Sequence, residues 1–98
     1  MYSITCSATA HAHDSYIHIL EVLDEQWGID KAYEFDVKTF KLLDSLALFK
    51  NLFPPSKTNP TLRKCTVSKY TALVYRIDDV LKQIELIAFL DRRMTNSL

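Results

Sequence analysis

The chain has very little glycine: Gly28 is the only one among its 98 residues. Loops that cradle phosphate groups need several glycines close together, and so does the sharp turn that exposes a catalytic serine. Neither loop can be built from this sequence. The shortage therefore argues against a conventional small-molecule enzyme, and we expect no cofactor.

Cysteine and long apolar runs are also scarce. Cys6 and Cys65 are far apart and form no C-x-x-C, which is typical of a reduced cytosolic protein with two small buried thiols, although a disulfide between them is also compatible with the sequence. No apolar stretch reaches the ~18 residues of a membrane helix. The start, MYSITCSATA, lacks the basic and then apolar order of a signal peptide. We expect a cytoplasmic protein with no membrane segment.

Net charge is absent too, because twelve Lys and Arg balance twelve Asp and Glu. This balance excludes a global attraction to nucleic acid. The charges are unevenly distributed, however: seven acidic residues and one lysine fall in residues 1–36 (−7 + 1 = −6), and eight basic residues and one aspartate fall in residues 37–77 (+8 − 1 = +7). The split predicts either one electropositive face or two solvated faces of opposite sign.

The sequence is 48% hydrophobic, enough for one domain over residues 1–98 to close a single core. A short alternating run at 2–7 predicts a strand. Helical spacing of apolar residues then predicts a helical hairpin over about 10–53, reversing at Gly28, with Asp30 as the N-cap of the second helix. The two expected apolar stripes are Ala12, Tyr16, Ile19, Leu20, Leu23 and Trp27, and Ala32, Phe35, Phe40, Leu42, Leu43 and Leu46.

Three strand-like runs follow the proline-rich loop FPPSKTNP, at 62–67, 70–77 and 83–91. Ser68-Lys69 and Asp78-Asp79 are the expected turns of the sheet hairpins over about 62–91. The third run is apolar on both faces (Ile84, Leu86, Ala88 and Leu90 on one, Ile87 and Phe89 on the other), which predicts a central or doubly covered strand. The order β-α-α-β-β-β indicates an α+β fold, a helical hairpin packed on a small, mostly antiparallel sheet.

Histidines gather in AHAHDSYIH, near the start of the first predicted helix. His11, Asp14 and His18 stand at i, i+3 and i+7, on one helical face, and could bracket a metal ion. No H-E-x-x-H motif and no nearby cysteine pair supports that interpretation. The pattern favours a polar first turn with solvated histidines, and we predict no metal site.

Basic residues mark the strands and their ends. Guanidinium groups bind phosphate bidentately and can stabilise charge on a phosphate oxygen, and antiparallel pairing can bring such residues onto one surface. The alternative is that they bond carboxylates of the domain itself. The candidate catalytic set is Arg63, Arg76 and Arg93, and the candidate binding set is Lys64, Lys69, Asp91 and Arg92.

Several segments together resemble a known family. WG with Ala32 and Phe35 behind it, then NPTLRK, KYTALVYRID and IELIAFLDRR, are similar in order and spacing to the RelE/ParE superfamily of toxins from bacterial type II toxin–antitoxin modules. Many members end in an apolar strand followed by Asp-x-Arg, which Asp91 and Arg93 match. The resemblance implies a cytoplasmic toxin, in a plasmid-stabilisation or similar module, that a cognate antitoxin wraps and holds inactive.

The family has two activities, and the residues bear on the choice. RelE-like members are metal-independent, ribosome-dependent ribonucleases that cut messenger RNA, whereas ParE-like members poison DNA gyrase. Metal-free cleavage needs a base, an acid and cations for the phosphate. Ala72 stands about where RelE-type enzymes place an arginine, and MTNSL (94–98) supplies neither tyrosine nor histidine. Tyr70 or Tyr75 could substitute only on the same surface.

We therefore predict a ParE-like toxin that inhibits growth by binding a target such as DNA gyrase. The first alternative is a RelE-like messenger RNA interferase, acting at the ribosome with Arg63, Arg76 and Arg93 around the phosphate. The second alternative is a degenerate member that only binds its antitoxin. In each case the expected partner surface is apolar: the helical hairpin, its groove against the sheet, or an exposed sheet edge.

Overall fold

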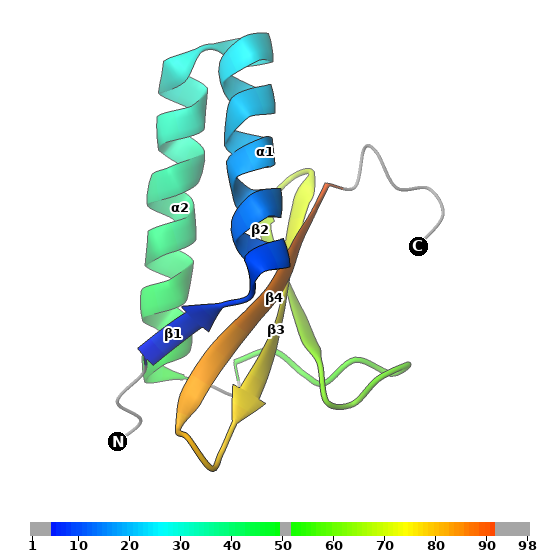
Figure 1. Ribbon diagram of the computed structural model, residues 1–98. Helices are drawn as coiled ribbons and strands as arrows, with labels where there is room; N and C mark the ends of the chain where they lie inside the picture. The colour runs from blue at the N-terminus through cyan, green and yellow to red at the C-terminus, as the bar shows by residue number, and fades with distance from the viewer. Residues whose placement is uncertain (1–4, 50–51, 92–98) are drawn as a thin grey trace.

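The computed structural model describes residues 5–49 and 52–91 (Figure 1). Two helices follow one short strand, and three longer strands complete the chain. The elements are β1 (Thr5–Ala8), α1 (Ala10–Trp27), α2 (Ile29–Leu48), β2 (Arg63–Ser68), β3 (Thr71–Asp78) and β4 (Gln83–Asp91). This order confirms the predicted β-α-α-β-β-β arrangement and the α+β class. The start of the first predicted strand, at 2–4, lies outside the described residues.

Local chemistry sets the ends of the helices. The Thr9 hydroxyl accepts a hydrogen bond from the Ala12 amide at 3.1 Å, and this cap begins α1. Gly28 ends α1 at φ +89° and is also the N-cap of α2, so one residue joins the helices. The prediction of Asp30 as the N-cap was wrong. Asp30 lies instead in the first turn of α2, where its charge complements the helix dipole.

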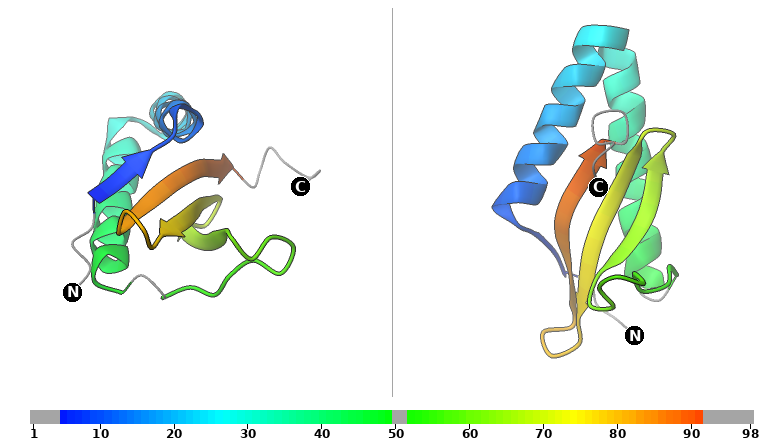
Figure 2. Two further views of the ribbon diagram at one scale, coloured as in Figure 1. Left: turned by 60° about the horizontal axis from the view of Figure 1, so that its bottom comes forward. Right: turned by 90° about the vertical axis from the view of Figure 1, so that its right-hand side faces the viewer.

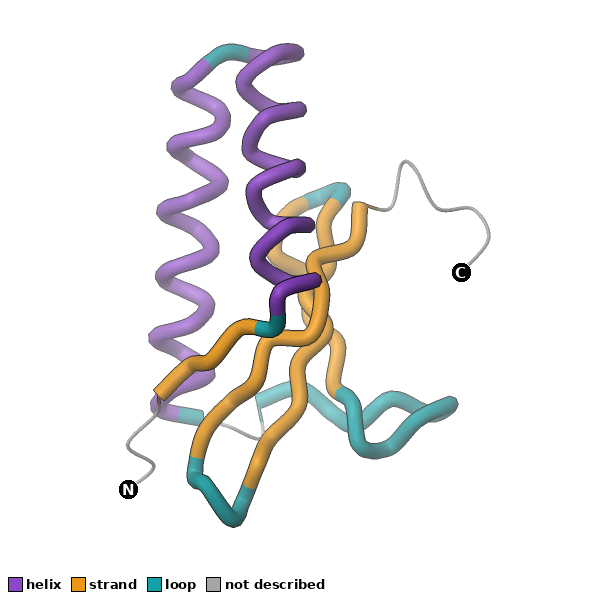
Figure 3. Tube along the Cα trace, viewed as in Figure 1, coloured by secondary structure: helices purple, strands orange, loops and turns teal. Residues whose placement is uncertain are grey.

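The four strands form one sheet in the order β1-β4-β3-β2. β1 pairs parallel with β4, and the other two pairs are antiparallel. The helical hairpin packs against one face of this sheet, as the turned views in Figure 2 and the trace in Figure 3 show. β4 lies between β1 and β3, which confirms the prediction that the third apolar run is a central strand.

One core lies between the hairpin and the sheet. Its buried residues are Ala12, Ile19, Phe35 and Leu46 from the helices and Cys65, Val67, Leu73, Tyr75, Ile84, Leu86 and Phe89 from the strands. Three residues of the predicted stripes neither join this core nor pack against it: Trp27 and Phe40, which are 62% and 60% exposed, and Ala32. Among the described residues, neither helix combines the length and the apolar character needed to cross a membrane.

A bulge in β4 changes which residues face the helices. The register passes from Val74↔Ala88 to Tyr75↔Leu86, so Ile87 is an extra residue in β4. The prediction that Ala88 and Leu90 lie on the same face of the strand as Leu86 was therefore wrong. Phe89 joins the helix-facing side instead. The opposite side of the sheet, the open face, carries Lys64, Thr66, Ala72, Val74, Arg76, Glu85, Ala88 and Leu90.

One predicted turn also shifts. β2 runs to Ser68 through an irregular register at Val67, so the tight turn is Lys69-Tyr70 and not Ser68-Lys69. α2 ends at Leu48, within the range of about 10–53 predicted for the helical hairpin. In the loop that follows, Pro55 forms an isolated bridge with Arg63 and holds the loop against the start of β2.

Candidate functional site

The open face is where a phosphate-binding set on the sheet would lie, and the pairing register defines its rows. Lys64, Val74 and Ala88 form one row, and Thr66, Ala72 and Leu90 form the next. A third row pairs Arg76 with Glu85. Cationic groups on the described part of this face are therefore Lys64 and Arg76 alone.

Arg76 is paired with a carboxylate of its own domain. Its guanidinium Nη2 lies 2.5 Å from Glu85 Oε1, across the β3–β4 pair. The arginine side chain is 47% and the glutamate 26% exposed, so solvent screens the pair and its contribution to stability is small. The pair does, however, cancel the charge that a phosphate group would use.

Arg63 lies on the other side of the sheet. It pairs in register with Tyr75, a core residue, and therefore belongs to the helix-facing side. Its Nη1 donates a 2.5 Å hydrogen bond to the Phe53 carbonyl oxygen, which fastens the proline-rich loop to β2. A joint phosphate-binding site requires Arg63 and Arg76 on one surface. The fold instead places them on opposite faces of the sheet.

The two tyrosines considered for proton transfer lie in different places. Tyr75 is fully buried in the core, and burial raises the pKa of its hydroxyl to about 12, with a further increase from nearby Cys65. Tyr70 lies in the β2–β3 turn, 43% exposed. Ala72, fully buried on the open face, offers no functional group there.

The thiol of Cys65 is free and buried, as expected for one of the two cysteines. Burial raises its pKa to about 11, so it is protonated and inert near neutral pH. The side chain of Cys6 lies outside the described residues. Within the described chain, no group of three or more His, Cys, Asp or Glu side chains could hold a metal ion.

Two further predicted residues, Lys69 and Asp91, lie at one end of the sheet. Lys69 lies in the β2–β3 turn, and Asp91 ends β4 opposite Thr71, the first residue of β3. Arg92 and Arg93, which follow Asp91 in the sequence, lie outside the described residues. The fold thus brings Lys69 and Asp91 to one end of the sheet and leaves Arg63 and Arg76 elsewhere.

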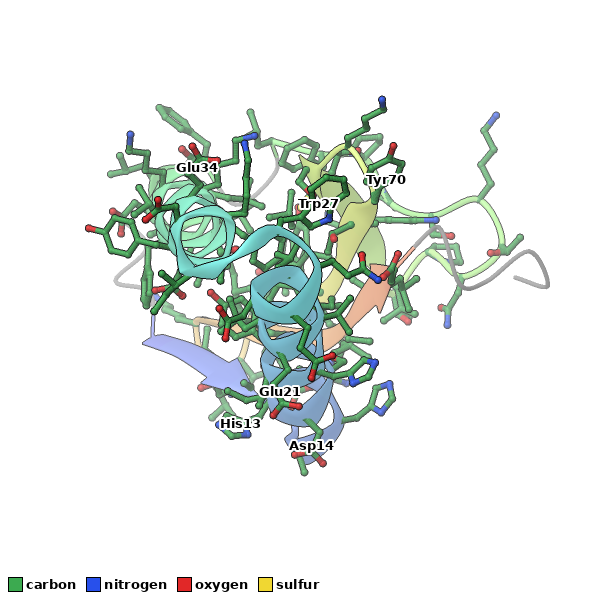
Figure 4. The ribbon with its side chains drawn as sticks, turned by 90° about the horizontal axis from the view of Figure 1, so that it is seen from above. His13, Asp14, Glu21, Trp27, Glu34 and Tyr70 are labelled. Carbon is green, nitrogen blue, oxygen red and sulfur yellow. The ribbon has the colours of Figure 1, made fainter. Side chains whose placement is uncertain are left out.

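Beside this end lies a pocket of about 330 Å³, the hairpin–turn pocket, between the helices and the β2–β3 turn. Leu23 and Phe35 contribute apolar surface to it, together with Trp27 and Tyr70. In the view of Figure 4, Trp27, Tyr70 and Glu34 are on the same side of the molecule, and all three line this pocket. The other lining residues are Lys31, Lys38, Ser68 and Lys69.

The charges of the hairpin–turn pocket are mostly positive. Lys31 makes a 3.2 Å ion pair with Glu34. The Lys69 ammonium lies 5.3 Å from the centroid of the Tyr70 ring, a cation–π geometry. Lys38 is exposed and adds a third positive charge. The sequence analysis named Lys69 and expected an apolar groove between the hairpin and the sheet. It assigned Trp27 to the buried stripe of the first helix and so missed its place in the pocket.

A second groove on the hairpin has the opposite charge. About 350 Å³ in volume, the acidic groove is lined by Leu20, Glu21, Asp24, Ile29, Ala32, Tyr33 and Asp36. Asp36 accepts a hydrogen bond from the Tyr16 hydroxyl, and burial together with this bond raises the pKa of Tyr16. In Figure 4, Glu21 lies on the side of α1 away from Tyr70, with His13 and Asp14. The uneven charge seen in the sequence thus becomes two oppositely charged surfaces.

Known proteins were compared with the chain at the levels of sequence and structure. No protein-family model and no curated protein matches the sequence. The structure is similar to that of the chromosomal ParDE TA system from P. aeruginosa, with a TM-score of 0.75, 17% identity, and 93% of this chain and 98% of that chain covered.

Two further solved structures are similar. The YoeB/ParE toxin from Agrobacterium tumefaciens has a TM-score of 0.67 and 13% identity, with 90% of this chain and 98% of that chain covered. A chain of the E. coli DinJ-YafQ complex has a TM-score of 0.56 and 12% identity, with 96% and 99% covered.

These likenesses define an α+β toxin-type fold, two helices packed on a four-stranded, mostly antiparallel sheet. More particularly, the chain has the RelE/ParE toxin fold, as the sequence resemblance predicted.

Proposed function

We propose that this protein is the toxin of a bacterial type II toxin–antitoxin module, of the ParE-like kind that acts by binding a target. The fold supports the toxin class, since its similar structures come from a ParDE TA system and a YoeB/ParE toxin. The choice within that class rests on the residues of the sheet. A cytoplasmic location and a role in plasmid stabilisation belong to the same proposal.

One observation carries the preference for binding over cleavage: on the described open face, strands β2 to β4 carry no tyrosine or histidine for proton transfer, and the arginine there is paired. Arg76 is paired with Glu85, and Arg63 bonds the Phe53 carbonyl oxygen from the other side of the sheet. Tyr75 is buried, and its raised pKa keeps its hydroxyl protonated near neutral pH. The groups left to transfer a proton on this part of the face are Lys64 and Glu85, and Glu85 is held by Arg76.

The proposed partner is an antitoxin encoded beside the toxin. One of the similar structures comes from a ParDE TA system, and another comes from a DinJ-YafQ complex. The hairpin of this chain offers the surface that such a partner needs, because large apolar side chains stand exposed along it: Trp27, Ile29 and Phe40 are each at least 60% exposed. DNA gyrase is the proposed cellular target.

Inducing the chain alone in bacteria tests this function. We expect growth to stop with induction of the DNA-damage response, and co-expression of the neighbouring reading frame to restore growth. A chain that is folded and expressed but does not stop growth is instead a degenerate member that only binds its antitoxin. The RelE-like alternative predicts instead that messenger RNA is cut at the ribosome when the chain is induced.

A further inference from the structure

We propose that the hairpin–turn pocket binds an acidic segment of the antitoxin, anchored by one large apolar side chain. The inference rests on the proposed function, which supplies the antitoxin, and adds the chemistry of the segment and its place on the toxin. Side chains from α1, α2 and the β2–β3 turn line the pocket. Its volume, about 330 Å³, lies in the range of pockets that bind small ligands.

The apolar anchor follows from the exposed aromatic surface. Trp27 is 62% exposed although it stands beside two apolar lining residues, Leu23 and Phe35. Tyr70, which is 43% exposed, lines the same pocket from the β2–β3 turn. When a partner removes exposed tryptophan and tyrosine from water, the burial of their apolar surface makes binding more favourable. Such residues dominate binding energies at interfaces.

The acidic character follows from the rim. Three lysines and one glutamate line the pocket, giving a net charge of +2 (3 − 1). Glu34 neutralises Lys31, whereas Lys69 lies over the Tyr70 ring and Lys38 is exposed. Carboxylates of a bound segment would complement Lys38 and Lys69 and would speed association at low salt.

The acidic groove is the competing place on the hairpin where an apolar anchor could bind, and its charge disfavours an acidic segment. It also presents a large exposed aromatic residue, Tyr33, which is 68% exposed. Its charged lining residues, Glu21, Asp24 and Asp36, are all acidic and repel an acidic segment. An acidic segment with an apolar anchor is thus directed to Trp27 and away from Tyr33 by charge alone.

The test uses short overlapping peptides that cover the protein encoded beside this chain, each labelled with fluorescein. Binding to the full-length chain is measured by fluorescence anisotropy at low and at physiological salt. We expect the binding peptides to share acidic residues next to a large apolar residue. Trp27→Ala should weaken their binding by at least about ten-fold, as loss of an interface tryptophan commonly does. Lys38→Glu should also weaken it, mainly at low salt.

Two matched variants serve as controls. Tyr33→Ala removes an aromatic side chain of similar exposure from the acidic groove, and Lys41→Glu reverses an exposed lysine on α2 that does not line the pocket. Both should leave peptide affinity within about two-fold, as surface changes outside an interface do. All four substitutions alter exposed side chains, and thermal unfolding checks that each variant is folded.

The inference is overturned if the peptides that bind are basic or uncharged, or if Trp27→Ala leaves their affinity unchanged. It is also overturned if Tyr33→Ala weakens binding as much as Trp27→Ala, or if no peptide binds while the whole antitoxin neutralises the toxin. Failure of the proposed function is distinguished by the growth experiment, in which the chain alone would then fail to stop growth.

Discussion

At the scale of single residues, Tyr75 is fully buried in the core, and its hydroxyl has no hydrogen-bond partner among the described residues. A buried hydroxyl without a partner costs about 1–3 kcal/mol, while its ring contributes packing. Tyr16, in contrast, donates its hydroxyl to Asp36. The two tyrosines therefore offer a comparison between an unpaired and a paired hydroxyl in one core.

We predict that Tyr75→Phe keeps or raises the free energy of unfolding, by up to about 1 kcal/mol, because it removes only the unpaired oxygen. Tyr16→Phe should lower it by about 1 kcal/mol, since it leaves Asp36 without that donor. Urea denaturation measures both. A loss of stability in Tyr75→Phe equal to that in Tyr16→Phe would mean that the Tyr75 hydroxyl is paired.

Cys65 predicts a dependence of stability on alkaline pH. Burial raises the pKa of its thiol from 9.0 to about 11, so the folded state holds this proton more tightly than the unfolded state. The resulting stabilisation is fully present below about pH 9 and is lost as the pH rises through about 11. Its size is roughly 2 kcal/mol.

Urea unfolding of the parent chain and of Cys65→Ala, from neutral pH to about pH 11, tests this dependence. The variant should be less stable at neutral pH, because it leaves a small cavity, but it should lose less stability above about pH 9. Groups that do not interact with Cys65 titrate alike in both chains and cancel in the difference, whereas Tyr75, whose pKa Cys65 raises, adds to the larger loss expected in the parent chain. If the free energy of unfolding fell with pH by the same amount in both chains, the prediction would be wrong.

At the scale of elements, Gly28 determines how the hairpin closes. Its φ of +89° and ψ of 169° fall in a region that essentially only glycine adopts, and one residue there joins the two helices. A Cβ atom at this position would meet nothing within 4 Å. The cost of a side chain is therefore backbone strain and not a clash.

We predict that Gly28→Ala lowers the free energy of unfolding by about 1–3 kcal/mol. Gly28→Asn should be no better, because asparagine is favoured in the left-handed helical region, which has a much smaller ψ. Thermal or urea unfolding of the two variants measures the effect. If Gly28→Asn were clearly more stable than Gly28→Ala, the turn would have the left-handed helical geometry instead.

The elements could be predicted from sequence where the signal is local, and less well where it is not. Apolar spacing located both helices and three strands within a few residues, because each depends on its own side chains. The N-cap at Gly28, in place of Asp30, depends on how sharply the hairpin closes. The extra residue Ile87 depends on pairing with β3, and it moved Ala88 to the open face. Neither effect can be predicted from the spacing of apolar residues along the chain.

At the scale of the whole molecule, the site was harder to predict than the fold. The order and spacing of the motifs indicated the RelE/ParE fold, which the structure confirms. Which cations share a surface depends on strand register, and that register separates Arg63 from Arg76. The hairpin–turn pocket joins Trp27 to Tyr70, residues that are distant in sequence. Such contacts appear only when the chain folds.

The sequence does account for the charge of the molecular surface. Acidic residues of the first third line the groove beside Tyr33, and lysines from later in the chain contribute most of the rim beside Trp27. A neutral protein thus presents two surfaces of opposite sign on one hairpin. Charge of this kind affects partner choice and association rate more than the fold itself.

The central proposal is that this protein, which has the RelE/ParE toxin fold, acts by binding a target and does not cut RNA. Primer extension on a reporter message, in bacteria induced to make the chain alone, tests it most directly. We expect growth arrest with an intact message, since strands β2 to β4 carry no tyrosine or histidine on the described open face and the arginine there is paired with Glu85. Discrete ribosome-dependent cuts that disappear in Arg93→Ala would contradict it.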